Sequence, residues 1–170
     1  MGFLLVVALV VAVLFGFVLL FGAPYVPTLR SQAELALDLL EVRPGQTLLE
    51  LGVGDGKVAI AAARRGLHVV GIELNPLLAA IAWLRTRRYR RKVRIICGDY
   101  WRVAWPPETD IVYAFLLQKY MARLDGHIEK WRSGPVKLAS IAFQLPAKQP
   151  VAAKQSVFVY EYRDTPKRTK

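Results

Sequence analysis

The residues of this chain best placed to do chemistry lie in the glycine-rich segment 50–56, which reads ELGVGDG. The apolar run Thr47–Leu51 is typical of a buried strand, and the residues after Gly56 are typical of a helix. A glycine turn between a strand and a helix is the geometry of nucleotide sites in open α/β sheets. Glycine adopts positive φ without strain and lets a ligand approach the backbone closely. We therefore expect Gly52, Gly54 and Gly56 to line a ligand site.

Three carboxylates stand at the ends of three successive predicted strands. Glu50 lies two residues before Gly52, where its charge suits a cationic amino-acid group better than a pyrophosphate. Glu73 ends the strand predicted over 68–73, where an acidic residue can accept hydrogen bonds from both hydroxyls of an adenosine ribose. Asp99 follows the third predicted strand and is placed to accept from an adenine amino group. The ligand that these groups suit together is S-adenosylmethionine.

Other interpretations of the same residues remain open. A dinucleotide site requires G-x-G-x-x-G, and Lys57 occupies the place of the third glycine, which disfavours an NAD-linked oxidoreductase. A lone G-x-G-x-G is a weak signal, and an acidic residue at a strand end is often only solvated or caps a helix. A degenerate fold that serves as a non-catalytic membrane scaffold or an RNA-binding module is a further alternative. The intact loop, together with Glu50, Glu73 and Asp99 in this order, favours the methyl-donor site.

Strands that alternate with helices must position these groups, and they predict a Rossmann-like, doubly wound, mostly parallel α/β sheet. Near-continuous apolar strands agree, because such sheets are covered on both faces. The segment 146–156 is predicted to be a loop. Strands are predicted over 47–51, 68–73, 93–97, 110–116, 136–143 and 157–162, and helices over 31–41 (with Ser31 as N-cap), 57–65, 76–89 (with Asn75 as N-cap) and 118–130.

The N-terminal segment 2–22 is wholly apolar, and no charged residue occurs before Arg30. As a helix it would be about 31 Å long, which matches the hydrocarbon core of a bilayer. A cleaved secretory signal is the alternative, but the segment has no basic start and no clear cleavage site. We expect an anchor at 1–23, a linker and helix at 24–45, a catalytic domain at 46–163 and a basic tail at 164–170. The positive-inside rule places the domain of this single-pass protein in the cytoplasm.

The 170 residues carry 24 Lys and Arg against 13 Asp and Glu, a net charge of +11 that predicts an anionic neighbour. Seven of the ten residues in 85–94 are basic. They could simply form a solvated helix end, but beside an anchor Arg85–Arg94 would be drawn to an anionic lipid surface. Nucleic acid is the less favoured partner. With Cys97 as the only cysteine, predicted to be buried in its strand, and His68 and His127 isolated, no disulfide or metal is expected.

The sequence resembles the seven-strand class I methyltransferases, and more narrowly the small membrane-anchored lysine methyltransferase family. Known members of that family modify the ATP synthase c-subunit and the adenine nucleotide translocase in mitochondria. The resemblance spans nearly the whole chain in order. It rests on the apolar start, on 25–28 (YVPT), 49–57 (LELGVGDGK) and 71–76 (GIELNP), and on 98–101 (GDYW), 113–116 (YAFL) and 143–146 (FQLP).

The resemblance implies which residues hold S-adenosylmethionine and that a lysine of a membrane protein accepts the methyl group. It implies a cofactor site formed by Pro27, Thr28, Glu50, Gly52, Gly54, Gly56, Glu73, Leu74, Asn75, Asp99 and Tyr100. The chain departs from the family pattern in three places: Glu50 replaces the usual Asp, Tyr100-Trp101-Arg102 replaces an aliphatic residue, Trp and Lys, and Gln144 occupies a place where Arg is usual. The acceptor pocket therefore need not match that of the family.

Transfer to lysine requires a neutral amine, and neutralising a lysine near pH 7.5 costs about 4 kcal/mol. Desolvation in an aromatic pocket supplies part of this, and Tyr25, Trp101, Tyr113 and Phe115 are the candidates to line one. We take Tyr113 and Tyr25 as the candidate catalytic residues, although Tyr113 and Phe115 could equally be core aromatics. Without an Arg- and Ser-rich leader, the chain fits a prokaryotic inner membrane better than a mitochondrial membrane, which is the expectation for a eukaryotic source.

Overall fold

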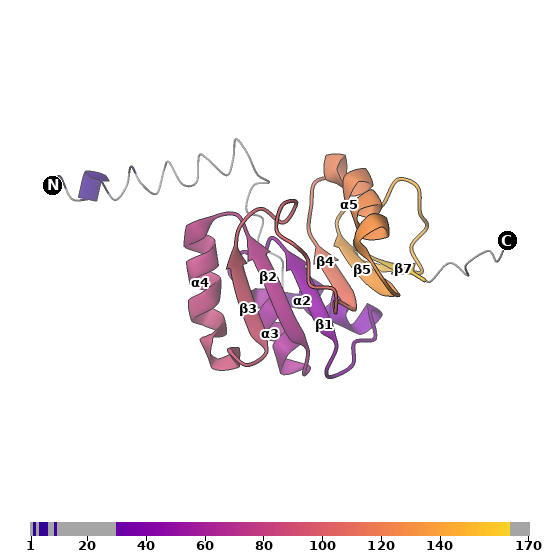
Figure 1. Cartoon of the computed structure of the whole chain (residues 1–170), viewed down its shortest axis with the longest axis horizontal. Coiled ribbons are helices and arrows are strands. Elements are labelled where there is room, and N and C mark those ends of the chain that lie inside the picture. The colour runs from indigo at the N-terminus through magenta and orange to yellow at the C-terminus, as the bar shows by residue number, and fades with distance from the viewer. Residues whose placement is uncertain (1, 3, 7–8, 10–29, 164–170) are drawn as a thin grey trace.

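A computed structural model describes residues 30–163, together with residues 2, 4–6 and 9 (Figure 1). Seven strands form one sheet in the order β3-β2-β1-β4-β5-β7-β6. The first five are parallel to one another, while β7 runs antiparallel to both β5 and β6. The strands are β1 (Thr47–Leu51), β2 (His68–Glu73), β3 (Val93–Cys97), β4 (Ile111–Ala114), β5 (Val136–Ile141), β6 (Ala152–Lys154) and β7 (Val157–Tyr162). The prediction of a mostly parallel α/β sheet is confirmed.

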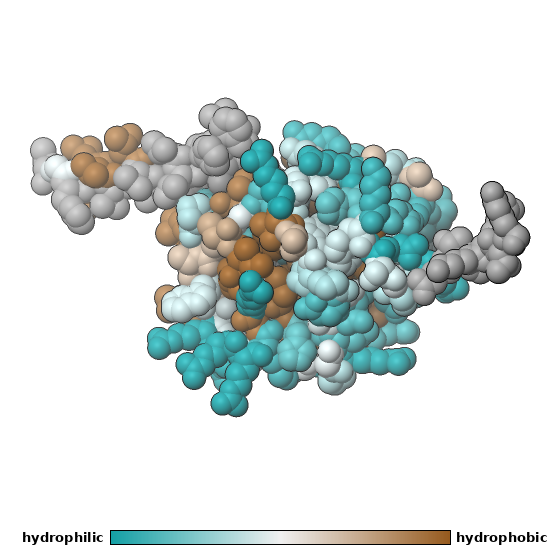
Figure 2. All heavy atoms as spheres, viewed as in Figure 1, coloured by the Kyte–Doolittle hydropathy of each residue, from teal (hydrophilic) through white to brown (hydrophobic). Residues whose placement is uncertain are grey.

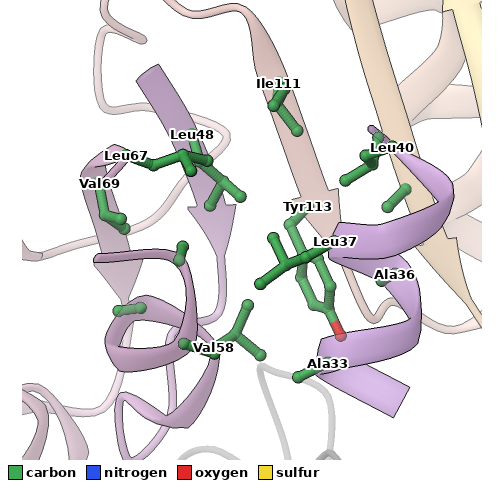
Figure 3. Packing of buried hydrophobic residues seen from close by; sticks show 14 of the residues in the cluster. Ala33, Ala36, Leu37, Leu40, Leu48, Val58, Leu67, Val69, Ile111 and Tyr113 are labelled. Carbon is green, nitrogen blue, oxygen red and sulfur yellow. The ribbon is translucent and has the colours of Figure 1, made fainter. Parts of the chain in front are cut away.

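Helices cover both faces of the sheet, which explains why the central strands are apolar on both sides. The helices are α2 (Arg30–Leu39), α3 (Lys57–Arg64), α4 (Pro76–Thr86) and α5 (Gln118–Trp131). One apolar cluster joins β1, β2 and β4 to α2 and α3. A second cluster joins the opposite face of the sheet to α5. Figure 3 shows the first cluster, in which Leu37 of α2 lies against Tyr113 of β4.

Several element ends differ from the predictions. Ser31 lies inside the first turn of α2, because that helix already includes Arg30, so Ser31 is not its N-cap. Helix α4 ends at Thr86 and continues as the 3₁₀ turn η1 (Arg87–Tyr89). The segment predicted to be a loop contains the short strand β6, which pairs with β7. The pattern did not indicate this strand, because three residues are too few to show a period.

The prediction that Cys97 is buried in its strand is wrong. Its side chain is exposed, because β3 is the edge strand of the sheet. The connection from β3 to β4 contains no helix, so Val70 and Ile96 beneath it remain half-buried. An edge strand with one thinly covered face buries its side chains less than a central strand does.

The predicted anchor lies almost entirely outside the described residues. Residues 2, 4–6 and 9 are helical, and Leu4, Leu5, Val6 and Leu9 are between 59% and 72% exposed. Within the part of the chain that the structure describes, no helix is long and apolar enough to cross a bilayer. Residues 164–170 of the predicted tail also lie outside it.

Candidate functional site

The glycine loop leaves β1 and bends sharply before α3. Gly52, Gly54 and Gly56 all have positive φ, at 79°, 56° and 81°. The amides of Gly52 and Val53 both donate to the carbonyl oxygen of Ile72 on β2, at 2.8 and 3.1 Å. The loop is therefore bonded to the neighbouring strand, and its backbone conformation is one that only glycine adopts without strain.

A fourth glycine, Gly71 of β2, makes room for this loop. A Cβ atom at Gly71 would lie 2.7 Å from Cγ2 of Val53, far inside van der Waals contact. Val53 is buried there, at 3% exposure. Sequence reasoning missed this role. The signal was a glycine in the middle of an otherwise β-branched strand, which often marks a close approach.

Glu73 binds the glycine loop to the end of β2. Its Oε2 accepts from the amide of Gly54 at 2.9 Å, and its Oε1 accepts from the amide of Asn75 at 2.9 Å. A carboxylate has about four acceptor positions, so two remain for a ligand. Besides the ribose contact expected from the sequence, Glu73 therefore has a role in ordering the glycine loop.

Glu50 is a buried acid with an uncommitted oxygen. Its exposure is 3%, and its Oε2 has no hydrogen-bond partner among the described residues. Burial, with the nearby charges of Asp55 and Glu73, raises the pKa of Glu50 well above its usual value. A buried acceptor without a partner costs free energy unless a ligand supplies a donor. The cation of an amino-acid group would satisfy it.

Asp55 connects the glycine loop to two helices. Its Oδ2 lies 3.1 Å from Nζ of Lys57 at the start of α3 and also accepts from Arg85 of α4. Burial alone would raise the pKa of Asp55, but these two cations lower it. Lys57, read in the sequence as a departure from the dinucleotide motif, therefore neutralises a loop carboxylate.

Asn75 caps α4 as predicted, and Pro76 is the first residue of that helix. The Oδ1 of Asn75 accepts from the amides of Leu77 and Leu78 at 2.9 and 3.3 Å. Its Nδ2 is buried and has no partner within the described residues. Leu74 beside it is half-buried. Asn75 therefore keeps a free donor next to Glu73.

Asp99 and Tyr100 follow β3, at the same carboxyl ends of the strands as the glycine loop and Glu73. Oδ1 of Asp99 accepts from the amide of Trp101 at 2.8 Å, and Oδ2 lies 3.6 Å from Nε of Arg102. The carbonyl oxygen of Tyr100 accepts from Nε1 of Trp105 at 2.7 Å. Burial raises the pKa of Tyr100 to about 12, which keeps its hydroxyl neutral.

The three candidate pocket aromatics that the structure describes, Trp101, Tyr113 and Phe115, do not come together. Tyr113 and Phe115 lie in the cluster on the α2 and α3 face, while Trp101 packs on the α5 face beside Tyr120, 6.3 Å away between ring centroids. Tyr113 does pair in register with Glu50 of β1, so the two side chains lie on the same face of the sheet. Tyr25, Pro27 and Thr28 lie outside the described residues. The catalytic assignment of Tyr113 and Tyr25 stays a prediction.

The basic segment begins beside the glycine loop, where Arg85 pairs with Asp55, and its residues 90–94 lie at the other end of the strands, next to the starts of β1 and β2. A hollow of about 390 Å³ opens there, lined by His68, Glu108 and residues 90–94 among others. His127 packs between Trp101 and Trp105 on α5, 5.8 and 4.4 Å from their ring centroids. In residues 30–163, no three His, Cys, Asp or Glu side chains are grouped to hold a metal.

The chemistry of the site fits the expected cofactor. Glu50 and Glu73 present acceptors for a cation and for hydroxyls, and Asn75 has a free donor. All of them lie where β1 and β2 end, the usual ligand position in an open α/β sheet. Fold and site together define a class I methyltransferase domain.

Comparison with known proteins identifies the family. The chain belongs to the family described as ANTKMT methyltransferase domain, whose model matches residues 50–152, more than half of the chain. It is 31% identical over 127 residues to the human lysine N-methyltransferase of the ATP synthase c-subunit, covering 72% of this chain and 53% of that protein. It is 34% identical over 138 residues to the mouse adenine nucleotide translocase lysine N-methyltransferase, covering 76% and 57%. The chain thus spans about half the length of these relatives.

A solved structure shares the fold over most of the chain. It is a Salinibacter ruber RNA methyltransferase in complex with S-adenosyl-L-homocysteine. The TM-score is 0.74 at 26% sequence identity, and the match covers 84% of this chain and 97% of that one.

Proposed function

We propose that this protein is an S-adenosylmethionine-dependent protein-lysine N-methyltransferase that acts on a membrane protein. The observation that carries the proposal is the arrangement of Glu73, which holds the glycine loop through Gly54 and still has acceptor positions free. The family supports lysine as the acceptor, because the two relatives described above are named lysine N-methyltransferases.

Each acidic residue of the site has a separate task in this mechanism. Glu50 would accept from the cationic amino group of the methionyl end, Glu73 from the ribose hydroxyls and Asp99 from the adenine amino group. The cofactor supplies a methyl group on a positively charged sulfur. The protein then has to position the acceptor amine in line with that methyl group. Positioning alone contributes a large part of the rate enhancement.

The acceptor lysine must lose its proton before transfer. A desolvated, partly aromatic surrounding lowers the pKa of a lysine because it disfavours the charged form. Tyr100, Trp101 and Tyr120 form one aromatic wall at this end of the sheet, and Tyr113 lies beside Glu50 on the opposite face. We infer that the acceptor lysine approaches the methyl group beside either this aromatic wall or Tyr113.

Residues 2–22 are the proposed membrane anchor, with the catalytic domain on the cytoplasmic side. The support is their uninterrupted apolar composition and the helical conformation of residues 2, 4–6 and 9. An anchored enzyme meets membrane proteins at a high local concentration, which suits a membrane-protein substrate.

Titration calorimetry with S-adenosylmethionine tests the cofactor part of the proposal. We expect the wild-type chain to bind and Glu73→Ala to bind roughly 30- to 100-fold more weakly, because a buried acceptor is lost and the loop loosens. Glu108→Ala removes an exposed carboxylate at the opposite edge and is the matched control, expected to bind like the wild type. A folded wild-type chain that binds neither S-adenosylmethionine nor its demethylated product would refute the proposal.

Mass spectrometry of membrane proteins from cells with and without the enzyme tests the acceptor. We expect lysine residues that gain one to three methyl groups only when the enzyme is present. Cofactor binding without any lysine methylation, or methyl transfer to RNA instead, would overturn the lysine assignment and leave the cofactor site intact.

A further inference from the structure

The outer face of α4 is apolar where an ordinary surface helix is polar. Leu78, Ala79 and Ala82 face the sheet, while Trp83 and Leu84 are 60% and 62% exposed. Ile81 is also exposed, at 36%. A helix that covers a sheet normally buries one apolar stripe and turns charged residues outward. The outward apolar side chains of α4 therefore need a partner or an apolar medium.

Exposed arginines follow directly on this apolar face. Arg87 and Arg88 lie three and four residues after Leu84, so they continue the same side of the helix. Arg90 and Arg91 extend the basic run beyond η1. Figure 2 shows a few apolar side chains at the rim formed by α4, a larger apolar area over β2 and β3, and long hydrophilic side chains projecting below them.

These arginines have little to neutralise them. Arg85 pairs with Asp55, but Arg87 and Arg88 have no carboxylate within 4 Å in the part of the chain that the structure describes. The guanidinium of Arg88 lies over the ring of Tyr89, 5.3 Å from its centroid. The surface thus combines free positive charge with an exposed indole and exposed aliphatic groups.

We propose that α4 lies flat on the surface of an anionic bilayer, with Trp83 and Leu84 at the level of the acyl-chain boundary and Arg87 and Arg88 on lipid phosphates. Helices that lie in a membrane interface have this composition, with Trp and Leu on one side and Lys or Arg beside them. Each basic residue near an anionic surface contributes about 1 kcal/mol. Burial of the apolar surface of the aliphatic side chains adds to the free energy of membrane binding.

Nucleic acid would meet the same charge, but it would leave the apolar face unused. Leu84 and Ile81 gain nothing from phosphates and remain in water in such a complex. A bilayer satisfies both parts of the surface, because its phosphates lie directly above its acyl chains. The combination of the two, on one helix, favours the membrane.

This docking would set the distance between the site and the bilayer. Helix α4 starts next to Asn75 and is about 16 Å long, so a helix lying flat holds the cofactor edge close to the membrane surface. The inference goes beyond the proposed function, because it depends neither on methyl transfer nor on residues 2–22.

Tryptophan quenching in lipid nanodiscs tests the docking on the full chain. The full chain is mixed with nanodiscs whose lipids carry brominated acyl chains, either with phosphatidylglycerol or with phosphatidylcholine alone. We expect strong quenching in the anionic discs only, and we expect Trp83→Phe to remove the quenched component. Arg87→Gln with Arg88→Gln should lower the docking equilibrium roughly 30-fold, or about fivefold for each charge.

The matched control is Lys154→Gln with Arg163→Gln, which removes two exposed charges at the far edge of the sheet. This variant should quench like the wild type. Near-ultraviolet circular dichroism checks that all variants keep the native fold. The inference would be overturned if Trp83→Phe were quenched as strongly as the wild type, or if both double charge variants lost the same amount of quenching. It would also be overturned if the chain bound RNA in a salt-sensitive way and showed no quenching. None of these readouts involves the cofactor, so failure here and failure of the proposed function are separate results.

Discussion

At the scale of single residues, the ligand-binding property of the site depends on which buried carboxyl oxygens lack a hydrogen-bond partner. Glu73 is buried at 8% exposure, and each of its carboxylate oxygens accepts from a backbone amide. Glu50 is buried at 3% and keeps an oxygen without a partner among the described residues. The protonation of Glu50 should therefore change when a cationic ligand binds.

The raised pKa of Glu50 predicts that cofactor affinity depends on pH. The folded, ligand-free protein keeps a proton on Glu50 at pH values where an ordinary carboxyl is ionised, because burial disfavours the charge. A cationic ligand must displace that proton, so affinity should rise by up to about tenfold per pH unit below the folded pKa. Calorimetry between pH 5.5 and 7.5, in two buffers of different ionisation enthalpy, would measure the proton released.

Glu50→Gln is the control for this prediction, and it should bind weakly with no slope of affinity against pH. The stability of the ligand-free protein should depend on pH in the opposite direction to cofactor affinity. A raised folded pKa stabilises the ligand-free protein below the unfolded pKa, and this contribution is lost as the pH rises through the folded pKa. A wild-type affinity that is flat over this range would contradict the assignment of Glu50.

At the scale of elements, the glycine loop is held in place by the strand next to it. Val53 packs against Gly71, and the amides of Gly52 and Val53 bond to Ile72. Asp55 adds ties to α3 and α4. The loop conformation is thus set by three elements and not by its own glycines alone.

Gly71→Ala should weaken cofactor binding at least tenfold, because the new methyl group would lie 2.7 Å from Val53 and displace the loop. Overpacking of this kind costs about 1–3 kcal/mol of folding free energy. Urea unfolding measures the stability, and calorimetry measures the binding.

Gly126→Ala is the matched control, since a Cβ at this exposed position in α5 meets nothing within 4 Å. It should stabilise the protein by about 0.5–1 kcal/mol, because alanine favours the helix, and it should leave binding unchanged. If Gly71→Ala bound the cofactor as well as the wild type, the close packing of the loop on β2 would not matter for the site.

At the scale of the whole molecule, the order of the strands decides which groups face water. β3 is the edge strand next to β2, and the helix-free connection to β4 leaves that side of the sheet thinly covered. Cys97 and the apolar face of α4 are exposed at this end. Residues 90–94 of the basic segment lie at the other end of the strands from the glycine loop, whereas Arg85 pairs with Asp55 of that loop.

The exposure of Cys97 predicts fast labelling of the native protein. A thiol-reactive dye should modify Cys97 within about tenfold of the rate for a free cysteine peptide at the same pH, since no structure has to open first. Absorbance of the released chromophore gives the rate, with and without denaturant. A reaction that requires denaturant would mean that β3 is covered.

The fold class, the glycine loop, the three strand-end acids and the cap at Asn75 could all be predicted from the sequence alone. These features are local or periodic, so neighbouring residues are enough to specify them. Four other features became apparent only in the folded protein. Glu73 orders the loop, Gly71 leaves room for Val53, Tyr113 and Trp101 lie on opposite faces of the sheet, and Cys97 and Trp83 are exposed. These properties depend on contacts between segments far apart in the chain and on the order of strands in the sheet. The periodicity of any single segment contains no information about either.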